Sequence, residues 1–254
     1  MPDYNSWFFT FLHHDLSFFN KGTIKCTNLF YMMYFLSFFT KILHLLPEEL
    51  SHLLALKSLK ILYLSGLLEI LMRINLNKKD NNFTITPLNT FNCKNKLGIA
   101  AGLDNDGEYI ACFSALGVGF IEVGTVTTIK QKANSRPRLF RNTKDTSLST
   151  RLDFNNNGVE ALVENLKNRK SKIPIGVSIG KNHNTPNSEA HKDYLFCMEK
   201  VYEYSSYIAI NISSPNTSDL RELSGDEFLE DLLNKIKSKQ IELSTSLQYV
   251  PIFL

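Results

Sequence analysis

The sequence lacks the features that mark several common classes of protein. Its four cysteines (Cys26, Cys93, Cys112 and Cys197) are widely spaced and form no CxxC pair, so neither a disulfide scaffold nor a zinc site is expected. The net charge is only +3 and there is no run of Lys or Arg, so nucleic acid is not an expected partner. No GxGxxG motif occurs, which argues against a dinucleotide-binding site.

The amino end also lacks the usual targeting signals. No arginine precedes Arg73, and Asp3 and Asp15 lie near the start, which is a poor fit to a mitochondrial transit peptide. A secretory signal is also a poor fit, because the sequence does not begin with basic residues followed by a small-residue cleavage site. The uncharged apolar stretch Asn28–Thr40 is shorter than the ~20 residues that a membrane-spanning helix needs.

The amino end is instead rich in aromatic residues and leucines. The one tryptophan and nine of the phenylalanines fall in the first forty residues: Trp7, Phe8, Phe9, Phe11, Phe18, Phe19, Phe30, Phe35, Phe38 and Phe39. The stretch Leu45–Leu71 then repeats leucine at three- and four-residue spacings, and Pro47 suits a helix start. Two interpretations stay open: a helix that packs on its own domain, or a helical pair in the membrane interface.

After the polar stretch Asn75–Asn82 the pattern changes to short apolar runs that alternate with charged, helix-like stretches. The runs are Leu97–Ala101, Phe120–Val126, Ile173–Ile179, Tyr207–Ile212 and Val250–Leu254. Alternating buried strands and helices predict a parallel α/β fold. Several runs end in small or polar residues, as at the catalytic face of a (β/α)8 barrel, and a doubly wound sheet is the alternative. Five strands are too few for a barrel of eight, so we expect an incomplete one.

The most specific segment is Tyr207–Leu223, YIAINISSPNTSDLREL. A buried strand there delivers amides and hydroxyls around a proline, which favours binding of a polar, planar ligand. A turn rich in capping residues is the alternative interpretation.

With six further segments, this one resembles the class 2 dihydroorotate dehydrogenases, the quinone-reducing flavoenzymes of pyrimidine synthesis. The others are LGIAAGLDNDGE (97–108), GVGFIEVGTVT (117–127), RPRLFR (136–141), FNNNG (154–158), IGVSIGKNHNTP (175–186) and DYLFCMEKVYEY (193–204). The motifs are collinear and correctly spaced, and residues 33–71 resemble the family's membrane-associating helices. The resemblance implies a (β/α)8 TIM barrel with about five of its eight strands, preceded by a helical membrane-associating region. The expected limits are an apolar, aromatic extension at 1–31, the helical region at 32–82 and the barrel part at 83–254.

The resemblance also implies a chemistry, in which FMN accepts a hydride from dihydroorotate, orotate is formed, and a membrane quinone is the final electron acceptor. Ser214 matches the catalytic base. The other matched positions are Ala101, Gly102, Thr125, Ser178 and Asn211 for FMN, Asn105, Thr150, Phe154, Asn211 and Asn216 for the substrate, and His52 and Arg141 for the quinone channel. The N-terminal helices would contact a membrane surface. Because the transit-peptide fit is poor, a bacterial inner membrane is favoured over a mitochondrial one.

The sequence departs from the family pattern at three of these positions and at Asp153. Asn105 stands where the family has a lysine that pairs with the orotate carboxylate, and losing such a contact costs ~1.5–3 kcal/mol. Thr150 replaces an asparagine, Ser178 replaces an asparagine found in many members, and Asp153 replaces a glycine. The Asp153 carboxylate is expected to repel the substrate.

These changes and the missing strands predict that the chain binds FMN poorly and has no turnover. Two alternatives remain. One is a non-catalytic, membrane-attached remnant, and the other is an FMN barrel with an altered substrate.

Overall fold

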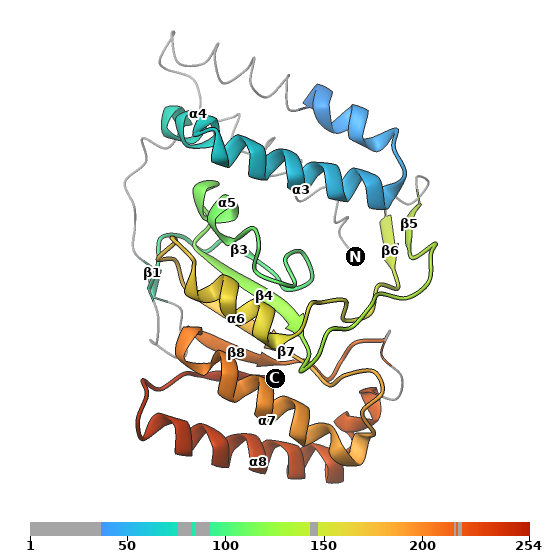
Figure 1. Cartoon of the computed structure of the whole chain (residues 1–254), viewed down its shortest axis with the longest axis vertical. Helices are drawn as coiled ribbons and strands as arrows, with labels where there is room; N and C mark the ends of the chain where they lie inside the picture. The colour runs from blue at the N-terminus through green and yellow to red at the C-terminus, as the bar shows by residue number, and fades with distance from the viewer. Residues whose placement is uncertain (1–36, 76–82, 85–91, 143–146, 216, 218–219) are drawn as a thin grey trace. The chain divides into compact units, whose positions relative to one another are not determined.

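The computed structural model describes residues 37–75, 83–84, 92–142, 147–215, 217 and 220–254 (Figure 1). The chain divides into two compact units. The first consists of residues 1–62 and 135–151, and the second of residues 63–134 and 152–254. The domain limits expected from the sequence, 1–31, 32–82 and 83–254, stay a prediction.

In the first unit, a helix over residues 37–44 precedes α3 (Glu48–Leu64). Pro47 lies just before α3 and its carbonyl accepts the Ser51 N–H, as expected for a proline at a helix start. Ser51 is the one buried residue of α3, so the leucines of this helix are largely accessible. Among the described residues, no helix is long and apolar enough to cross a lipid bilayer.

A β-hairpin completes the first unit. Strand β5 (Leu139–Asn142) pairs antiparallel with β6 (Ser147–Thr150). The Glu49 carboxylate joins α3 to the chain that leads into the hairpin: Arg138 Nε donates to Glu49 Oε1 at 2.8 Å, and Arg136 Nε lies 2.6 Å from Glu49 Oε2. The alternating pattern of apolar runs did not predict this hairpin.

The second unit contains a parallel sheet of five strands in the order β3-β4-β7-β8-β9. The strands are β3 (Gly98–Ile99), β4 (Phe120–Val126), β7 (Ile175–Ile179), β8 (Tyr207–Ile210) and β9 (Ile252–Phe253). Each lies within one of the five predicted runs, so that prediction is confirmed. The described strands form an open sheet, with β3 and β9 at its edges.

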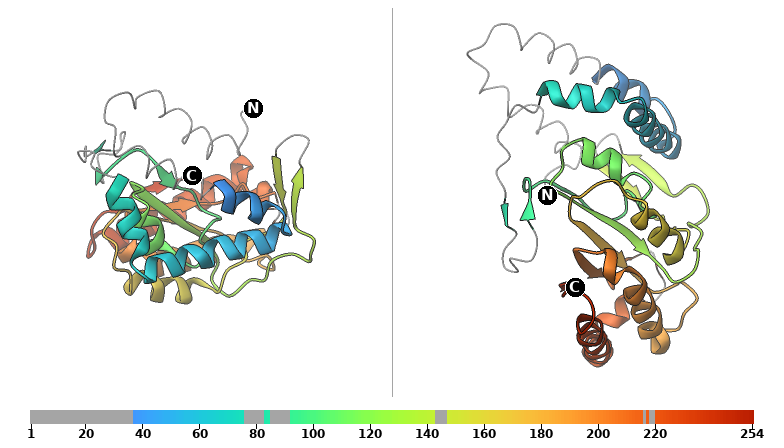
Figure 2. Two further views of the ribbon diagram at one scale, coloured as in Figure 1. Left: turned by 90° about the horizontal axis from the view of Figure 1, so that it is seen from above. Right: turned by 60° about the vertical axis from the view of Figure 1, so that its left-hand side comes forward.

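Helix α4 (Leu67–Asn75) precedes the strands of this sheet. The helices between successive strands are α5 (Ile110–Ala115), α6 (Val159–Lys167), α7 (Ala190–Val201) and α8 (Asp226–Ser244). Helix α7 contacts both α6 and α8, and these three helices lie side by side along the sheet (Figure 2). Short 3-10 turns lie at Asn187–Glu189, Tyr202–Tyr204 and Leu220–Ser224, and a two-residue ladder joins β1 (Phe83–Thr84) to β2 (Asn92–Cys93).

The core lies between the sheet and these helices. All five residues of β7 are buried, which explains why the strand reads as a continuous apolar run. Helix α7 presents Tyr194, Cys197, Met198 and Val201 to this core. Cys93, Cys112 and Cys197 are buried free thiols. The core therefore fixes the sheet whose carboxyl edge carries the predicted site residues.

Candidate functional site

Three predicted residues meet at the carboxyl ends of neighbouring strands. Thr125 lies at the end of β4, Ser178 near the end of β7, and Asn211 directly after β8. The Thr125 and Ser178 hydroxyl oxygens are 2.9 Å apart, and Asn211 Nδ2 donates to Thr125 Oγ1 at 2.9 Å. We call these three residues the strand-end cluster. Because parallel strands end at one edge, residues 86 positions apart form a single hydrogen-bonded group.

The backbone of Asn211 is itself held in place. Its N–H donates to the Ile179 carbonyl at 3.0 Å, and its carbonyl accepts the Tyr194 hydroxyl at 2.9 Å. Tyr194 is fully buried in α7, and burial raises the pKa of its hydroxyl, which therefore stays protonated as a donor. The cluster is thus supported from the helix layer, and sequence reasoning did not assign this role to Tyr194.

Two glycines are hydrogen-bonded to each other beside the cluster. Gly102 N–H donates to the Gly124 carbonyl at 2.7 Å, and both residues have a positive φ. A Cβ on Gly124 would overlap the Ser178 carbonyl oxygen, whereas one on Gly102 would meet nothing within 4 Å. Gly124 is therefore needed for strand packing, and the predicted Gly102, next to Ala101, borders open space.

The loop after β3 is held by two acidic groups, the buried Asp104 and the partly exposed Asp106. The Asp104 carboxylate accepts the N–H groups of Glu108 and Tyr109, both at 2.8 Å. Burial raises the pKa of Asp104 to about 6, although these two hydrogen bonds oppose the rise. Asp106 accepts the backbone N–H and the side-chain amide of Asn157, both at 2.7 Å.

Asn105, between these two acids, has an acceptor without a donor. Its Nδ2 donates to the Asn155 carbonyl at 2.7 Å, and its buried Oδ1 has no hydrogen-bond partner within the described part of the chain. An unpaired buried acceptor typically costs ~1–3 kcal/mol. A ligand with an N–H or O–H donor would remove that cost.

Phe154 lies against the end of β7. Its ring carbon Cε2 is 2.8 Å from the position that a Cβ on Gly180 would occupy, and the Thr125 methyl group is 2.7 Å from the same position. Because Gly180 has no Cβ, the buried Phe154 ring and the Thr125 methyl group can both pack against it. The predicted contact of Phe154 with the substrate stays a prediction.

The segment that carries Ser214 begins at the cluster. Asn211 Oδ1 accepts the Ser213 N–H at 3.2 Å, and the Ser213 carbonyl accepts Arg221 Nε at 3.3 Å. Ser214 follows and is partly exposed. Asn216 lies outside the described residues, so its predicted role stays a prediction.

The remaining predicted residues belong to the first unit. Arg141 Nη1 donates to the carbonyls of His44 at 2.7 Å and Leu46 at 3.5 Å, so it fixes β5 against the chain before α3. His52 lies in α3, and burial lowers the pKa of its imidazole. Thr150 ends β6 opposite Leu139 and is exposed. The predicted roles of these three residues stay predictions.

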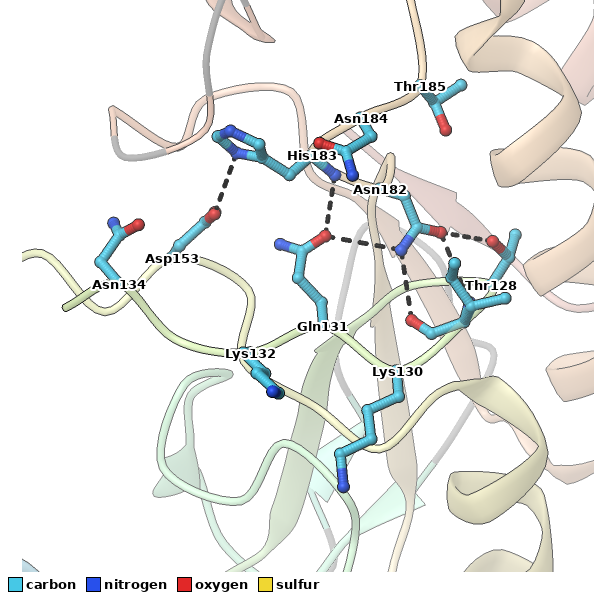
Figure 3. Close-up of a pocket in the computed structure, with 11 residues that line it drawn as sticks. Thr128, Lys130, Gln131, Lys132, Asn134, Asp153, Asn182, His183, Asn184 and Thr185 are labelled. Carbon is cyan, nitrogen blue, oxygen red and sulfur yellow. Dashed lines mark hydrogen bonds and ion pairs between the residues drawn. The ribbon is translucent and has the colours of Figure 1, made fainter.

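A pocket of about 400 Å³ in the second unit is lined by the loop after β4, by the loop after β7, which belongs to the motif at 175–186, and by Asp153 (Figure 3). Its lining residues are Thr128, Ile129, Lys130, Gln131, Lys132, Asn134, Asp153, Asn182, His183, Asn184 and Thr185. Asp153, expected to repel a substrate, turns its carboxylate toward His183, whose Nδ1 is 3.2 Å from Asp153 Oδ2. This pairing joins distant loops, and no local sequence signal indicates it.

Comparison with known proteins supports the motif assignment. A family model described as dihydroorotate dehydrogenase matches residues 85–253. A dihydroorotate dehydrogenase (quinone) of Shewanella frigidimarina is 48% identical over 215 residues, covering 84% of this chain and 62% of the relative. The corresponding protein of Aliivibrio fischeri is 54% identical over 162 residues, covering 63% of this chain and 48% of the relative.

A solved structure is also similar. The DHODH of Eimeria tenella in complex with ferulenol superposes with a TM-score of 0.64 at 29% identity, covering 78% of this chain and 52% of that one. The similarity and the strand order confirm the predicted barrel-type α/β class. The chain thus spans about half the length of the proteins it matches.

Proposed function

Because the chain belongs to the dihydroorotate dehydrogenase family, we propose that its strand-end cluster is part of a site that oxidises dihydroorotate to orotate. FMN would accept the hydride, and quinone would be the final electron acceptor. The observation that carries the proposal is the hydrogen-bonded group of Thr125, Ser178 and Asn211 beside the Ser214 segment. It lies at the strand edge where barrel enzymes have their active sites.

The residues present fit the polar edge of a flavin ring. The cluster offers hydroxyl and amide groups, the open side of Gly102 would let a ring approach the backbone, and Asn105 Oδ1 is a buried acceptor that lacks a donor. A ring N–H of a flavin or a pyrimidine is a donor of the required kind. When bound, FMN would supply hydride acceptance, which no amino-acid side chain provides.

Ser214 would take the proton that leaves the substrate carbon next to the hydride donor. A positioned base of this sort contributes typically ~10²–10⁴-fold to the rate. The hydrogen bonds of Ser213 to Asn211 and Arg221 fix the chain immediately before Ser214. Asn211 would thereby link the position of the base to the polar edge that holds the cofactor.

Phe154 would provide a flat apolar contact for the substrate ring. Asn105 would hold the substrate with a neutral amide, which is weaker toward a carboxylate than a cation. The loss of ~1.5–3 kcal/mol corresponds to an affinity lower by roughly 10- to 150-fold. The proposed substrate is therefore held weakly, and a substrate panel can distinguish orotate chemistry from an altered specificity.

Membrane attachment through the first unit is part of the proposal. Several large apolar side chains of α3 are exposed: Leu50, Leu53, Leu54, Ile61 and Leu64. A helix of this kind can lie in the membrane interface with its lysines at the surface. A bacterial inner membrane that contains quinone is the proposed location.

The test uses two proteins. The first is the chain as given, titrated with FMN and followed by flavin fluorescence, and we expect weak binding and no turnover. The second is the chain fused to the segment that follows the matched region in the Shewanella frigidimarina relative. We expect this fusion to hold FMN and to reduce a soluble ubiquinone analogue when dihydroorotate is added.

The outcomes separate the candidate functions. A fusion that holds FMN but ignores dihydroorotate would favour a barrel with an altered substrate, for which Asn105 is the supporting observation. A fusion that folds but does not hold FMN would refute the proposed function and favour a non-catalytic remnant. Firm binding of FMN by the chain alone would contradict the prediction of weak binding.

A further inference from the structure

Asp153 combines two unfavourable features that require compensation. It is the one non-glycine residue with a positive φ in the described part of the chain, with φ 62°. Its side chain is only 3% exposed. Aspartate tolerates the left-handed conformation better than most residues, but a buried carboxylate is costly unless hydrogen bonds or a cation satisfy it.

The N–H of the next residue and groups from two other loops satisfy this carboxylate. Oδ1 accepts the Thr217 hydroxyl at 2.6 Å and the Phe154 N–H at 2.8 Å. Oδ2 lies 3.2 Å from His183 Nδ1, in the loop after β7 (Figure 3). The 2.6 Å distance to Thr217 is typical of a hydroxyl that donates to a charged acceptor.

We propose that Asp153 is a positioning residue that holds the segment carrying Ser214, a role that rests on the proposed function of that serine. Asn211 and Arg221 fix the segment before Ser214, through Ser213. Thr217 is the contact on the other side, three residues beyond Ser214, and Asp153 is its acceptor. The segment is therefore fixed on both sides of the proposed base.

The same carboxylate connects the base to the substrate face. Its Oδ1 fixes the backbone of Phe154, whose ring packs against Gly180 beside the strand-end cluster. One side chain thus sets the distance between the loop of Phe154 and the loop of Ser214. The carboxylate therefore connects the two loops, and it faces Thr217 and His183 rather than solvent.

Three variants separate a positioning role from a backbone role. Asp153→Gly keeps the positive φ without strain but removes the carboxylate. Asp153→Asn tolerates the same φ and keeps an acceptor for Thr217. Thr217→Val removes the donor with little change of shape. If Asp153 served only to supply a residue with a positive φ, Asp153→Gly would leave the stability of the protein unchanged or raise it.

The measurement is hydrogen–deuterium exchange by mass spectrometry on the full chain, which needs neither flavin nor substrate. Losing a hydrogen bond to a charged acceptor corresponds to a roughly 10- to 150-fold change in a local opening equilibrium. We expect exchange in residues 211–223 to rise by about that factor in Asp153→Gly and Thr217→Val. Exchange in α6 serves as the control and should not change. Asp153→Asn should resemble the wild type, and the two single changes should not add when combined.

Wild-type exchange of residues 211–223 in Asp153→Gly, or additive effects in the double variant, would overturn the proposal. If Asp153→Gly also raises exchange in α6, the result for Thr217→Val is decisive. A rise in exchange confined to residues 211–223 in Thr217→Val still supports the proposal, and no rise in that segment refutes it. The outcome does not depend on whether the chain binds FMN. A failure of this inference is therefore distinguishable from a failure of the proposed function.

Discussion

Replacing Thr125 with valine tests whether the strand-end cluster depends on the hydroxyl at its centre. The change keeps the shape and β-propensity of the side chain but removes the acceptor for Asn211 Nδ2 and the partner of Ser178 Oγ. Thr125 and Ser178 are buried, so the groups left behind cannot be fully rehydrated. Each unpaired group costs ~1–3 kcal/mol when it is fully buried, and Asn211 is only partly buried, so we expect Thr125→Val to lower the free energy of unfolding by about 2–4 kcal/mol.

Urea unfolding followed by far-ultraviolet circular dichroism measures this loss. The single tryptophan lies at position 7, far from the cluster in the sequence, which makes tryptophan fluorescence a poor reporter. Thr245→Val is the matched control, because Thr245 is exposed and its hydroxyl donates only to the Glu242 carbonyl at the end of α8. The control should change stability by less than about 0.5 kcal/mol. Equal unfolding midpoints for the two variants would refute the argument that the cluster is a buried, coupled group.

Three further predictions concern charge and surface. Asn105→Lys should strengthen orotate binding to the FMN-loaded fusion by roughly 10- to 150-fold in isothermal titration calorimetry, and an equal gain in the remote, exposed control Asn168→Lys would contradict a local effect. Burial raises the pKa of Asp104 from 3.8 to about 6, so the folded state binds the extra proton in this range. The wild type should therefore lose roughly 3 kcal/mol of stability relative to Asp104→Asn as pH rises from about 3, below the unfolded pKa, to about 7, above the folded pKa. Urea unfolding at both pH values measures this difference, and a constant gap would argue against a perturbed Asp104. Leu53→Glu should weaken cosedimentation with phosphatidylethanolamine–phosphatidylglycerol vesicles by roughly tenfold or more. The control Ile241→Glu, on the exposed side of α8, should leave vesicle binding unchanged. Equal binding of the two variants would exclude α3 as the attachment surface.

The parallel strands were predictable because a strand buried on both faces appears in the sequence as a continuous run of apolar residues. Ile175–Ile179 is buried at every residue and reads as one apolar run bounded by polar ones. The hairpin of β5 and β6 has no such trace, since every residue of Ser147–Thr150 is exposed. Its pairing depends on partners across a turn rather than on burial.

The sequence motifs named the three members of the strand-end cluster but could not predict how they are connected. The motifs named Thr125, Ser178 and Asn211, and the sheet brings these three together. Sequence alone could not show that Thr125 is the central partner, because that depends on the register of three strands. Nor could it show that the Asp153 carboxylate pairs with Thr217, 64 residues away, rather than facing a ligand.

The span between Thr125 and Asn211 has a consequence for synthesis on the ribosome. Asn211 supplies a hydrogen bond to a residue made 86 positions earlier, so the cluster cannot exist until β7 and β8 have both left the exit tunnel and paired. Such long-range parallel pairing forms slowly compared with local helices. A growing chain therefore passes through lengths at which α5 and α6 can be in place while the polar groups at the sheet edge still lack their partners. The ability to recognise a planar ligand would then arise in one late event, and a ligand present during translation would favour chains that have completed it.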